Sequence, residues 1–598
     1  MIATPSARAL PPGAHCDARG TTFVVLATKP SSVAVRLFDE HARPIRTVPL
    51  ERPGGGARFE TRVEGVLAGA LYDFVLDGEP TPDPYARFLP RGVHGPARVT
   101  AATRTPPLAA PPPLHRWSIY ELHVGAFTPE GTFRGAIARL DHVVDLGATA
   151  IELLPIAAFD GARGWGYDGV ALYAPHAPYG APEDLRALVE AAHARGLAVV
   201  LDVVYNHFGP SGNYLARYAP EYFTSKVSTP WGDAPDFTWE PMRQLVLGSA
   251  RRWLDELGVD ALRLDATHAV HDASPRHVLR ELADLAHARG RLVFFEDERN
   301  EPDVVHELAA DAVWADDFHH QLHALVTGER DGYYAAYEPS VRALAACVQR
   351  GWTFEGQPYA PWRGRPRGKP ATGIARERLV TCVQNHDQVG NRALGERLSA
   401  LCSRDAYAAA VLLALFVPST PLIFMGQEWA ASTPFLYFTA HEGELGAAVS
   451  RGRREEFASF AAFADPALRE RIPDPEAPST FEASRLRWEE AAGADHARAL
   501  DLHRAMLHLR RGDPVLSRPC GDGELTAAER EDGVLEVVRT SGADERRLVV
   551  NFGRRAVPFT PPAGARVLLA SGPRADGTLG PHGAVLLALD RAASGAPR

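Results

Sequence analysis

The pattern of hydrophobic and polar positions changes twice along the chain and divides it into three parts. Before residue 105, short alternating runs at 22–26, 33–37 and 72–76 are separated by Pro and Gly clusters. Period-two alternation between such clusters predicts a β-sandwich over residues 1–105. The Pro-rich segment 106–116 can form neither a helix nor a central strand, so we expect a stiff linker there.

From residue 117 to residue 513, apolar runs alternate with stretches in which apolar residues recur every three or four positions. Helices are predicted at 136–146, 183–195, 242–257 and 275–288. Eight candidate strands are centred on Ile119, Ile151, Val200, Leu262, Phe294, Val313, Val383 and Ile423. Strands alternating with helices indicate a parallel sheet covered by helices, and eight such units predict an α/β fold, the (β/α)8 TIM barrel.

Two gaps in this alternation are long, and the helical periodicity stops after residue 513. Residues 208–240, rich in Pro, Tyr, Trp and Gly, are predicted to form an enlarged loop rather than a helix. A second gap, 332–369, is rich in aromatic residues. In the last part, 514–598, runs at 534–538, 547–550, 566–569 and 584–587 predict a small all-β domain.

Composition excludes several classes of function. Of the 598 residues 45% are hydrophobic and 23% charged, and no apolar run approaches the about 18 residues of a membrane span, so we expect no membrane partner. The first residues lack a basic and then apolar stretch, which predicts a cytoplasmic enzyme. A net charge of −10 without a basic cluster argues against nucleic acid. Five scattered cysteines argue against a disulfide framework and a zinc site.

Three of the predicted barrel strands end in acidic residues. The strand around Leu262 carries Arg263 and Asp265, which are two positions apart and therefore share a face; an arginine beside a carboxylate keeps it ionised. An isolated pair of this kind is more often a structural ion pair. However, further strands end in Glu296 and in Asp387, and in TIM barrels the C-terminal strand ends carry the catalytic side chains.

Four strand ends together resemble the four signature regions of the α-amylase superfamily of glycoside hydrolases: 202–207, 263–265, Glu296 and 385–387. By this resemblance Asp265 is the nucleophile, Glu296 the acid/base, and Asp387 the carboxylate that holds sugar hydroxyls. The resemblance also assigns sugar contacts to Tyr167, His207 and His386, and gives Arg263 the role of keeping Asp265 ionised. Aromatic residues of 332–369 could stack on sugars: Tyr333, Tyr334, Trp352, Phe354, Tyr359 and Trp362.

Two expectations concern the chemistry of this set. Glu296 must hold a proton to act as an acid, so negative neighbours and partial desolvation should raise its pKa. Classical α-amylases use the counterpart of Asn206 in a calcium site, but 208–239 shows no ligand cluster and Asn206 can instead bond backbone. We therefore expect no metal and no cofactor.

Finer features resemble one family within the superfamily. The N-terminal sandwich, of the kind found in carbohydrate-binding modules, the stretch 117–125 and the C-terminal β domain are shared by branching enzymes, debranching enzymes and malto-oligosyltrehalose trehalohydrolases. Stretches 204–215, 296–300 and 314–320 resemble the last family. This resemblance implies retaining hydrolysis of the α-1,4-glucosidic bond next to the terminal trehalose of malto-oligosyltrehalose, coupled to a malto-oligosyltrehalose synthase.

Residues after the acid and after the sixth strand are candidates for contacts with the trehalose unit: Asp297, Glu298, Arg299, Asp317 and His319. Each can equally form a salt bridge within its loop. The alternative within the superfamily is a branching or debranching enzyme. An amylase-like barrel that only binds is a further alternative, but such proteins lose catalytic carboxylates, and here all three are present.

Overall fold

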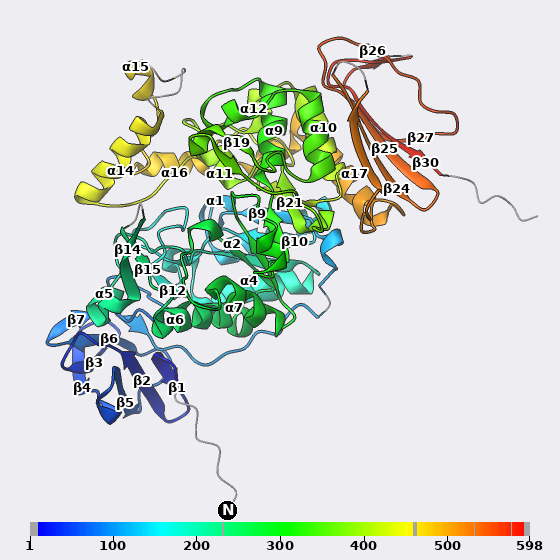
Figure 1. Cartoon of the computed structure of the whole chain (residues 1–598). Helices are drawn as coiled ribbons and strands as arrows, with labels where there is room; N and C mark the ends of the chain where they lie inside the picture. Colours follow the sequence, from blue (N-terminus) through cyan, green and yellow to red (C-terminus); the bar gives the residue numbers. More distant parts are fainter. Residues whose placement is uncertain are drawn as a thin grey trace, which may run out of the picture.

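The computed structural model describes residues 10–109, 111–229, 232–457, 463, 465–530, 533–575 and 577–590. A closed barrel lies at the centre, with the N-terminal sheets (blue) on one side and the C-terminal sheet (orange and red) on the other (Figure 1). The predicted fold class, a TIM barrel with an N-terminal β-sandwich and a C-terminal all-β domain, is confirmed. The domain boundaries at residues 105, 116 and 513 stay predictions.

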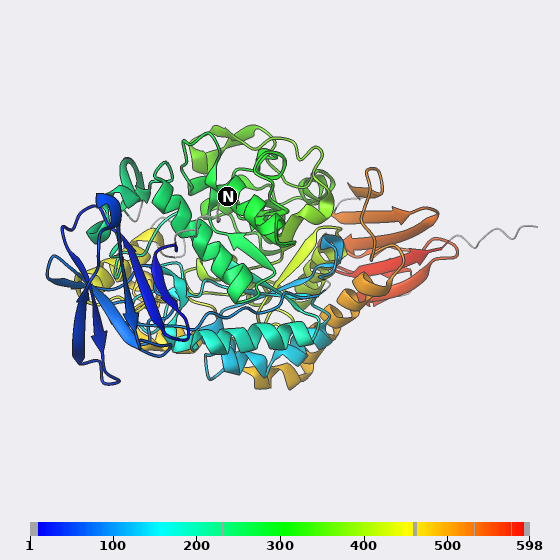
Figure 2. The ribbon, with the colours of Figure 1, turned by 90° about the horizontal axis from the view of Figure 1, so that it is seen from below.

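The N-terminal part consists of two antiparallel sheets. One has the order β1 (Gly13–Cys16), β2 (Gly20–Leu26), β5 (Arg58–Glu64). The other contains β3 (Val33–Phe38), β4 (Pro44–Pro49), β6 (Leu71–Leu76), β7 (Glu79–Thr81) and β8 (Ala97–Arg98). Their alternating apolar residues form one buried cluster, which also includes Val170 and Tyr218 of the barrel part. The sandwich therefore packs directly on a barrel loop, as seen from below in Figure 2.

Eight parallel strands close the barrel, and β22 pairs with β9. They are β9 (Ile119–Leu122), β10 (Ala150–Leu153), β13 (Ala198–Val203), β16 (Ala261–Leu264), β17 (Leu292–Phe295), β18 (Ala312–Trp314), β21 (Leu379–Cys382) and β22 (Thr420–Phe424). All eight predicted strands are present in the predicted order. Only the centre Val383 lies outside its strand, because β21 ends at Cys382.

Inward-facing residues of the strands form two layers, because residues two apart on a strand point the same way. The lower layer is an apolar cluster drawn from all eight strands, which includes Ile119, Ala150 and Phe294. Two residues further towards the C-terminal ends stand the ionisable residues of the upper layer: Glu121, Glu152, Asp202, Arg263 and Glu296. The barrel is thus a packed core below and a polar site above.

Most helices of the barrel follow the predicted periodicity. The clear exception is 136–146, which is split into α2 (Phe133–Ile137) and α3 (Leu140–Leu146). The predicted helix 275–288 begins only at α7 (Val278–His287), because Asp272 accepts from the Val278 amide at 2.7 Å and pairs with Arg243. The other predicted helices are α4 (Pro182–Ala194) and α6 (Glu240–Arg251), which continues as a π-helical turn, Arg252–Glu256.

The remaining helices surround the barrel or connect it to its neighbours. Those preceding β22 are α1 (Val124–Phe127), α5 (Leu215–Tyr218), α8 (Asp303–His306), α9 (Asp316–Thr327), α10 (Val341–Arg350), α11 (His386–Gly390), α12 (Leu398–Leu401) and α13 (Arg404–Phe416). After β22 come α14 (Gly443–Glu456), α15 (Pro466–Arg469), α16 (Pro478–Ser484) and α17 (Ala494–Gly512). None of the helices in the described ranges has the length and apolar character needed to cross a membrane.

Both long gaps contain ordered elements. The loop 208–240 holds α5 and a hairpin of β14 (Phe223–Thr229) and β15 (Gly232–Pro235). The segment 332–369 holds α10 and a hairpin of β19 (Gln357–Tyr359) and β20 (Arg365–Arg367). A third hairpin pairs β11 (Ala157–Ala158) with β12 (Ala171–Pro175). The prediction of sugar-stacking aromatics in 332–369 is wrong for four of the six, which are buried in the protein interior: Tyr334, Trp352, Phe354 and Tyr359.

The C-terminal part is all β, as predicted. A five-stranded antiparallel sheet has the order β23 (Leu525–Glu529), β24 (Val534–Ser541), β25 (Asp544–Asn551), β30 (Ala584–Leu589), β27 (Arg566–Ser571). A smaller sheet contains β26 (Val557–Pro558), β28 (Arg574–Ala575) and β29 (Thr578–Leu579). This part packs against α10 and α13, on the side of the barrel away from the N-terminal sheets (Figure 1).

Candidate active site

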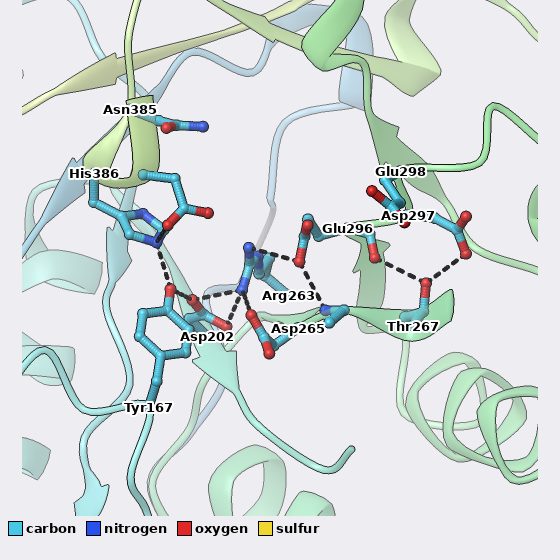
Figure 3. Close-up of polar contacts among 12 residues, drawn as sticks. Tyr167, Asp202, Arg263, Asp265, Thr267, Glu296, Asp297, Glu298, Asn385 and His386 are labelled. Atoms are coloured by element: carbon cyan, nitrogen blue, oxygen red, sulfur yellow. Dashed lines mark hydrogen bonds and ion pairs between the residues drawn. The ribbon is translucent and has the colours of Figure 1, made fainter. Parts of the chain in front are cut away.

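Arg263, fully buried on β16, is the centre of the upper layer. Its Nη1 donates to both carboxylate oxygens of Asp202 and to Oδ1 of Asp265, each at 2.8 Å, and its Nη2 donates to Oε2 of Glu296 at 3.3 Å (Figure 3). The guanidinium also lies over the Trp314 ring, 4.5 Å from its centroid. One buried cation therefore holds three carboxyl groups from three consecutive barrel strands.

Asp202 is the residue of this network that sequence reasoning missed as a site residue. It is buried, and burial raises its pKa to about 6, although Arg263 acts in the opposite direction. The available signal was its place at the end of β13, directly in register with Arg263 on β16. Neighbouring strands in register bring side chains of equal height together, so the pair could have been found once the barrel was assumed.

Asp265 is held from two sides. Arg263 binds one carboxylate oxygen, and the Asn206 side-chain amide donates to the other, Oδ2, at 2.9 Å and to the Asp265 backbone carbonyl at 3.0 Å. Two donors on one carboxylate fix its orientation. Asn206 thus forms a hydrogen bond to the backbone, which was one of its two predicted roles. It also orients the side chain of Asp265, the proposed nucleophile.

Glu296 lies beside Asp265 but in a different environment. Its Oε2 accepts from the Ala266 backbone amide at 2.7 Å and from Arg263. Ala266 adopts a left-handed conformation (φ 39°), which a residue with a side chain rarely does. Burial first, and then the negative charges of Asp265 and Asp387, raise the pKa of Glu296 to about 8 against the effect of Arg263. The carboxyl therefore carries a proton at neutral pH, as its proposed role requires.

His386 and Tyr167 form the opposite wall of the site. The Tyr167 hydroxyl lies 2.7 Å from His386 Nε2 and donates to Asp202 Oδ2 at 2.6 Å, while the two rings stack with centroids 5.4 Å apart. His386 Nδ1 is bound by Glu121 at 2.5 Å. Burial alone would lower the pKa of His386, but Glu121 and Asp387 raise it to about 9. The structure thus brings Tyr167 and His386 to the site.

Asp387 is the most open of the three predicted catalytic carboxylates, with its side chain 41% exposed. Its Oδ1 lies 3.6 Å from His386 Nε2 and accepts from the Asn391 side chain at 3.2 Å. It stands in the first turn of α11, whose start is capped by the Asn385 side chain accepting from the Gln388 amide at 2.8 Å. This cap places the carboxylate at the mouth of the barrel, where it is free to accept from a ligand.

His207 lies beneath the site rather than at its surface. Its side chain is buried, with Nε2 2.9 Å from the Tyr167 carbonyl and Nδ1 against the Asn206 side-chain oxygen. Burial lowers the pKa of His207. Both ring nitrogens are therefore engaged by protein, and His207 supports the backbone of Tyr167 and the side chain of Asn206.

The candidates that follow the acid divide by exposure. Asp297 is buried, accepts from Thr267 Oγ1 at 2.9 Å and pairs with Arg299 at 2.6 Å. Arg299 and Glu298 are open, with side chains 40% and 49% exposed. Figure 3 shows Asp297 and Glu298 beyond Glu296 on the side away from His386. The structure therefore leaves Glu298 and Arg299 as candidate ligand contacts, with Asp297 as the anchor of Arg299.

Asp317 and His319 are not brought to the open site. Asp317 is 0% exposed, and its oxygens accept from Asn300, Tyr337, Arg367 and two backbone amides. His319 is 2% exposed, between the Val383 carbonyl and the Tyr334 hydroxyl at 2.7 and 2.9 Å. The prediction that these two residues contact substrate is therefore not retained, because every polar atom is already bonded within the protein.

A calcium site of the classical amylase kind does not fit these residues. Asn206 uses its oxygen on His207 and its amide on Asp265. Among the described residues, no group of three His, Cys, Asp or Glu side chains is placed to hold a metal ion.

Comparison with known proteins agrees with this geometry. Residues 98–230 match the family model for the alpha amylase catalytic domain, and residues 522–586 match a domain of unknown function, DUF3459. The closed barrel and its network of carboxylates define a glycoside hydrolase of the α-amylase superfamily.

The malto-oligosyltrehalose trehalohydrolase of Deinococcus radiodurans is 48% identical over 95% of this chain and 94% of its own. That of a Rhizobium species (strain M-11) is 40% identical over 91% of this chain and 95% of its own. The chain belongs to the family of malto-oligosyltrehalose trehalohydrolases. A crystal structure from Salmonella typhimurium, described provisionally as an alpha amylase, matches with a TM-score of 0.88 at 36% identity, covering 97% of this chain and 99% of that one.

Proposed function

We propose that this enzyme hydrolyses the α-1,4-glucosidic bond next to the terminal trehalose unit of a malto-oligosyltrehalose, releasing trehalose and a shorter maltodextrin. The observation that carries the proposal is the pairing of Glu296, whose pKa is raised to about 8, with Asp265, which Arg263 and Asn206 hold. One carboxyl is thus ready to give a proton and the other to attack. The names of the relatives support the choice of substrate.

The reaction proceeds in two displacements. In the first, Asp265 attacks the anomeric carbon while Glu296 protonates the oxygen of the departing trehalose unit, and the glycosidic bond breaks. In the second, Glu296 takes a proton from water, the water oxygen attacks the same carbon, and the bond to Asp265 breaks. Direct attack requires the two carboxyl groups to stand about 5–5.5 Å apart. The maltodextrin leaves with the α configuration retained.

The other residues of the site serve the positively charged transition state. We propose that Asp387 accepts from hydroxyls of the reacting sugar and that the Tyr167 ring lies beneath it. Because Asp387 and Asp265 are fixed before reaction by their partners, they need little rearrangement as positive charge develops on the sugar. Arg263 and Asn206 act on Asp265 and do not contact the substrate in this proposal.

Recognition of trehalose belongs to the side of Glu296 away from His386. Trehalose is non-reducing and bent differently from maltose, so polar groups placed for its hydroxyls are left unpaired by a maltose unit. Unpaired buried polar groups discriminate strongly between substrates. The open residues there are Glu298 and Arg299, and we propose them as contacts of the trehalose unit.

The test compares two substrates of equal length. Given maltotriosyl-trehalose, the enzyme should release trehalose and maltotriose, initially as the α-anomer, and should cut plain maltopentaose far more slowly. Product chromatography with early sampling separates the outcomes. Equal rates on both substrates, or glucose as the first product, would return the chain to a general α-glucan hydrolase.

Two further tests address the alternative activities and the role of the open residues. A branching or debranching reaction, which the family membership does not favour, would change the iodine stain of amylose or of a branched glucan. Glu298→Gln should reduce the preference for the trehalose-capped substrate, whereas Glu301→Gln, a control in the same loop whose carboxylate pairs with Lys369 at 2.7 Å, should not. An unchanged preference in Glu298→Gln would remove that residue from the site.

The proposed function also concerns the source of the substrate and the location of the enzyme. A trehalose end must be made on a maltodextrin before this enzyme can release it, so we propose that a malto-oligosyltrehalose synthase feeds the reaction. A cytoplasmic location and the absence of nucleic acid partners stay predictions from the sequence.

A further inference from the structure

The proposed mechanism leaves one buried carboxylate of the upper layer without a role. Glu121, on β9, is 1% exposed, and both of its oxygens are used on one residue of another strand end. Oε2 accepts from the His386 backbone amide at 3.0 Å, and Oε1 lies 2.5 Å from His386 Nδ1. Glu121 and His386 are 265 positions apart in the chain. In the closed barrel β22 pairs with β21 on one side and with β9 on the other, so barrel closure brings the two residues together.

The hydrogen bonds around His386 have a fixed direction. A carboxylate only accepts, so His386 Nδ1 must donate to Glu121. The Tyr167 hydroxyl donates its one hydrogen to Asp202 at 2.6 Å, so it can only accept from His386 Nε2 at 2.7 Å. With both ring nitrogens donating, the imidazole is a cation.

We propose that Glu121 is a positioning residue of the reaction, which holds His386 as a cation with its Nε2 proton directed at Tyr167 and beside Asp387. This proposal rests on the proposed function, which assigns the sugar hydroxyls to Asp387. A fixed positive charge 3.6 Å from Asp387 Oδ1 keeps that carboxylate in place at the mouth of the barrel. Loss of the charge would release both Asp387 and the Tyr167 ring.

Several charged or titratable groups face His386 from the surrounding elements: Glu121, His123, Glu152, Tyr167, Asp202, Arg263 and Asp387. Burial and Arg263 oppose the charged imidazole, while Glu121 and Asp387 favour it, and the balance raises the pKa of His386 to about 9. Of these favourable groups only Glu121 bonds the ring directly. The carboxylate of β9 therefore decides the charge.

Glu152 offers a matched control in the same layer. It lies directly opposite Glu121 on the neighbouring strand β10 and is equally buried, but neither of its oxygens has a hydrogen-bond partner among the described residues. Burial and then the charge of Glu121 raise its pKa far above that of an ordinary carboxyl. Glu152 is thus neutral, so Glu152→Gln changes an acid to an amide of equal shape and equal charge.

The experiment measures kcat/KM from pH 5 to pH 9 for wild type, Glu121→Gln and Glu152→Gln. The wild-type alkaline limb is set by Glu296, whose pKa is about 8. Glutamine cannot balance the imidazole cation, so in Glu121→Gln the charge of His386 should be lost below that pH, and the alkaline limb should move down by more than one pH unit. Glu152→Gln should keep the wild-type limb. An unchanged limb in Glu121→Gln, or a loss of equal size at every pH, would overturn the proposal.

A second measurement does not use Glu121→Gln, so it applies even if that variant does not fold. It also requires no substrate. In the wild-type enzyme labelled with ¹⁵N-histidine, the His386 imidazole, assigned from its absence in His386→Asn, should be doubly protonated at pH 7.5. A neutral imidazole at that pH would overturn the proposal even if the hydrolytic reaction is as proposed. Conversely, a failure of the trehalose assay would leave this result standing.

Discussion

The two layers inside the barrel are built by the same strands and differ in almost everything else. On β17, Phe294 of the lower layer lies in an apolar cluster and contacts the Trp117 ring edge-on at 5.5 Å, while Glu296, two positions further, faces Arg263. On β9 the corresponding pair is Ile119 and Glu121. The lower layer contributes burial of apolar surface, whereas the upper layer holds the ionic network to which we assign the chemistry.

Because the two layers differ in this way, substitutions in the lower layer should change stability, and substitutions in the upper layer should change activity. Removing apolar volume from a core costs transfer free energy and leaves a cavity, so lower-layer changes should act on folding. Exchanging an upper-layer carboxylate for its amide keeps shape and most hydrogen bonds, so it should act on chemistry. A buried ion pair adds little net stability, because desolvation of the charges offsets their attraction.

The largest expected effect comes from the two carboxylates that are proposed to react. Glu296→Gln should lower kcat by about 10²–10⁴-fold, the range for loss of general acid–base catalysis. Asp265→Asn removes the attacking group and should lose at least as much. Steady-state kinetics measures the loss, and circular dichroism melting serves as the folding control. More than a tenth of wild-type activity in either variant would contradict the assignment.

The matched change in the lower layer should have the opposite signature. Phe294→Ala, on the strand that Glu296 directly follows, should lower the free energy of unfolding by about 3–5 kcal/mol through lost burial and a cavity. The kcat of the molecules that remain folded should change little. Urea unfolding and active-site titration check the two parts. If Phe294→Ala lost activity without losing stability, the separation of the layers would be wrong.

The pH dependence sharpens the comparison within the upper layer. In the proposed mechanism Glu296 acts in its protonated form, and its pKa is raised to about 8, so kcat/KM should be constant just below that pH and fall about tenfold per unit above it. A pH profile of the wild-type enzyme on the trehalose-capped substrate measures this limb. An alkaline limb near pH 5, the range of an ordinary exposed glutamate, would show that burial does not act on Glu296 as described.

The smallest expected effect is that of a chelator. If neither layer holds a metal ion, dialysis against a strong chelator should change neither activity nor melting temperature. A metal bound only to the folded protein would contribute stability, which its removal would reveal. A large fall in melting temperature would restore Asn206 as a candidate ligand, and re-addition of calcium would then recover the loss.

The sequence by itself determined the strands and their charged ends. Apolar runs located all eight barrel strands, and the spacing of Arg263 and Asp265 placed both side chains on one face, where they pair at 2.8 Å. The order of the four motifs, which resemble those of the superfamily, predicted Glu296 and Asp387 as site residues. These are local properties, because the period of a pattern reports which face of an element is buried.

Only the tertiary structure decided which of the remaining polar and aromatic residues are available. Asp317 and His319 follow a strand end, as a binding residue would, but surrounding loops bury them among protein partners. The sequence placed Glu121 in a predicted strand but gave it no role. Its contact with His386 depends on closure of the barrel. The physical reason is that burial and hydrogen-bond partners depend on contacts between segments hundreds of residues apart, and no local pattern records which segments will meet.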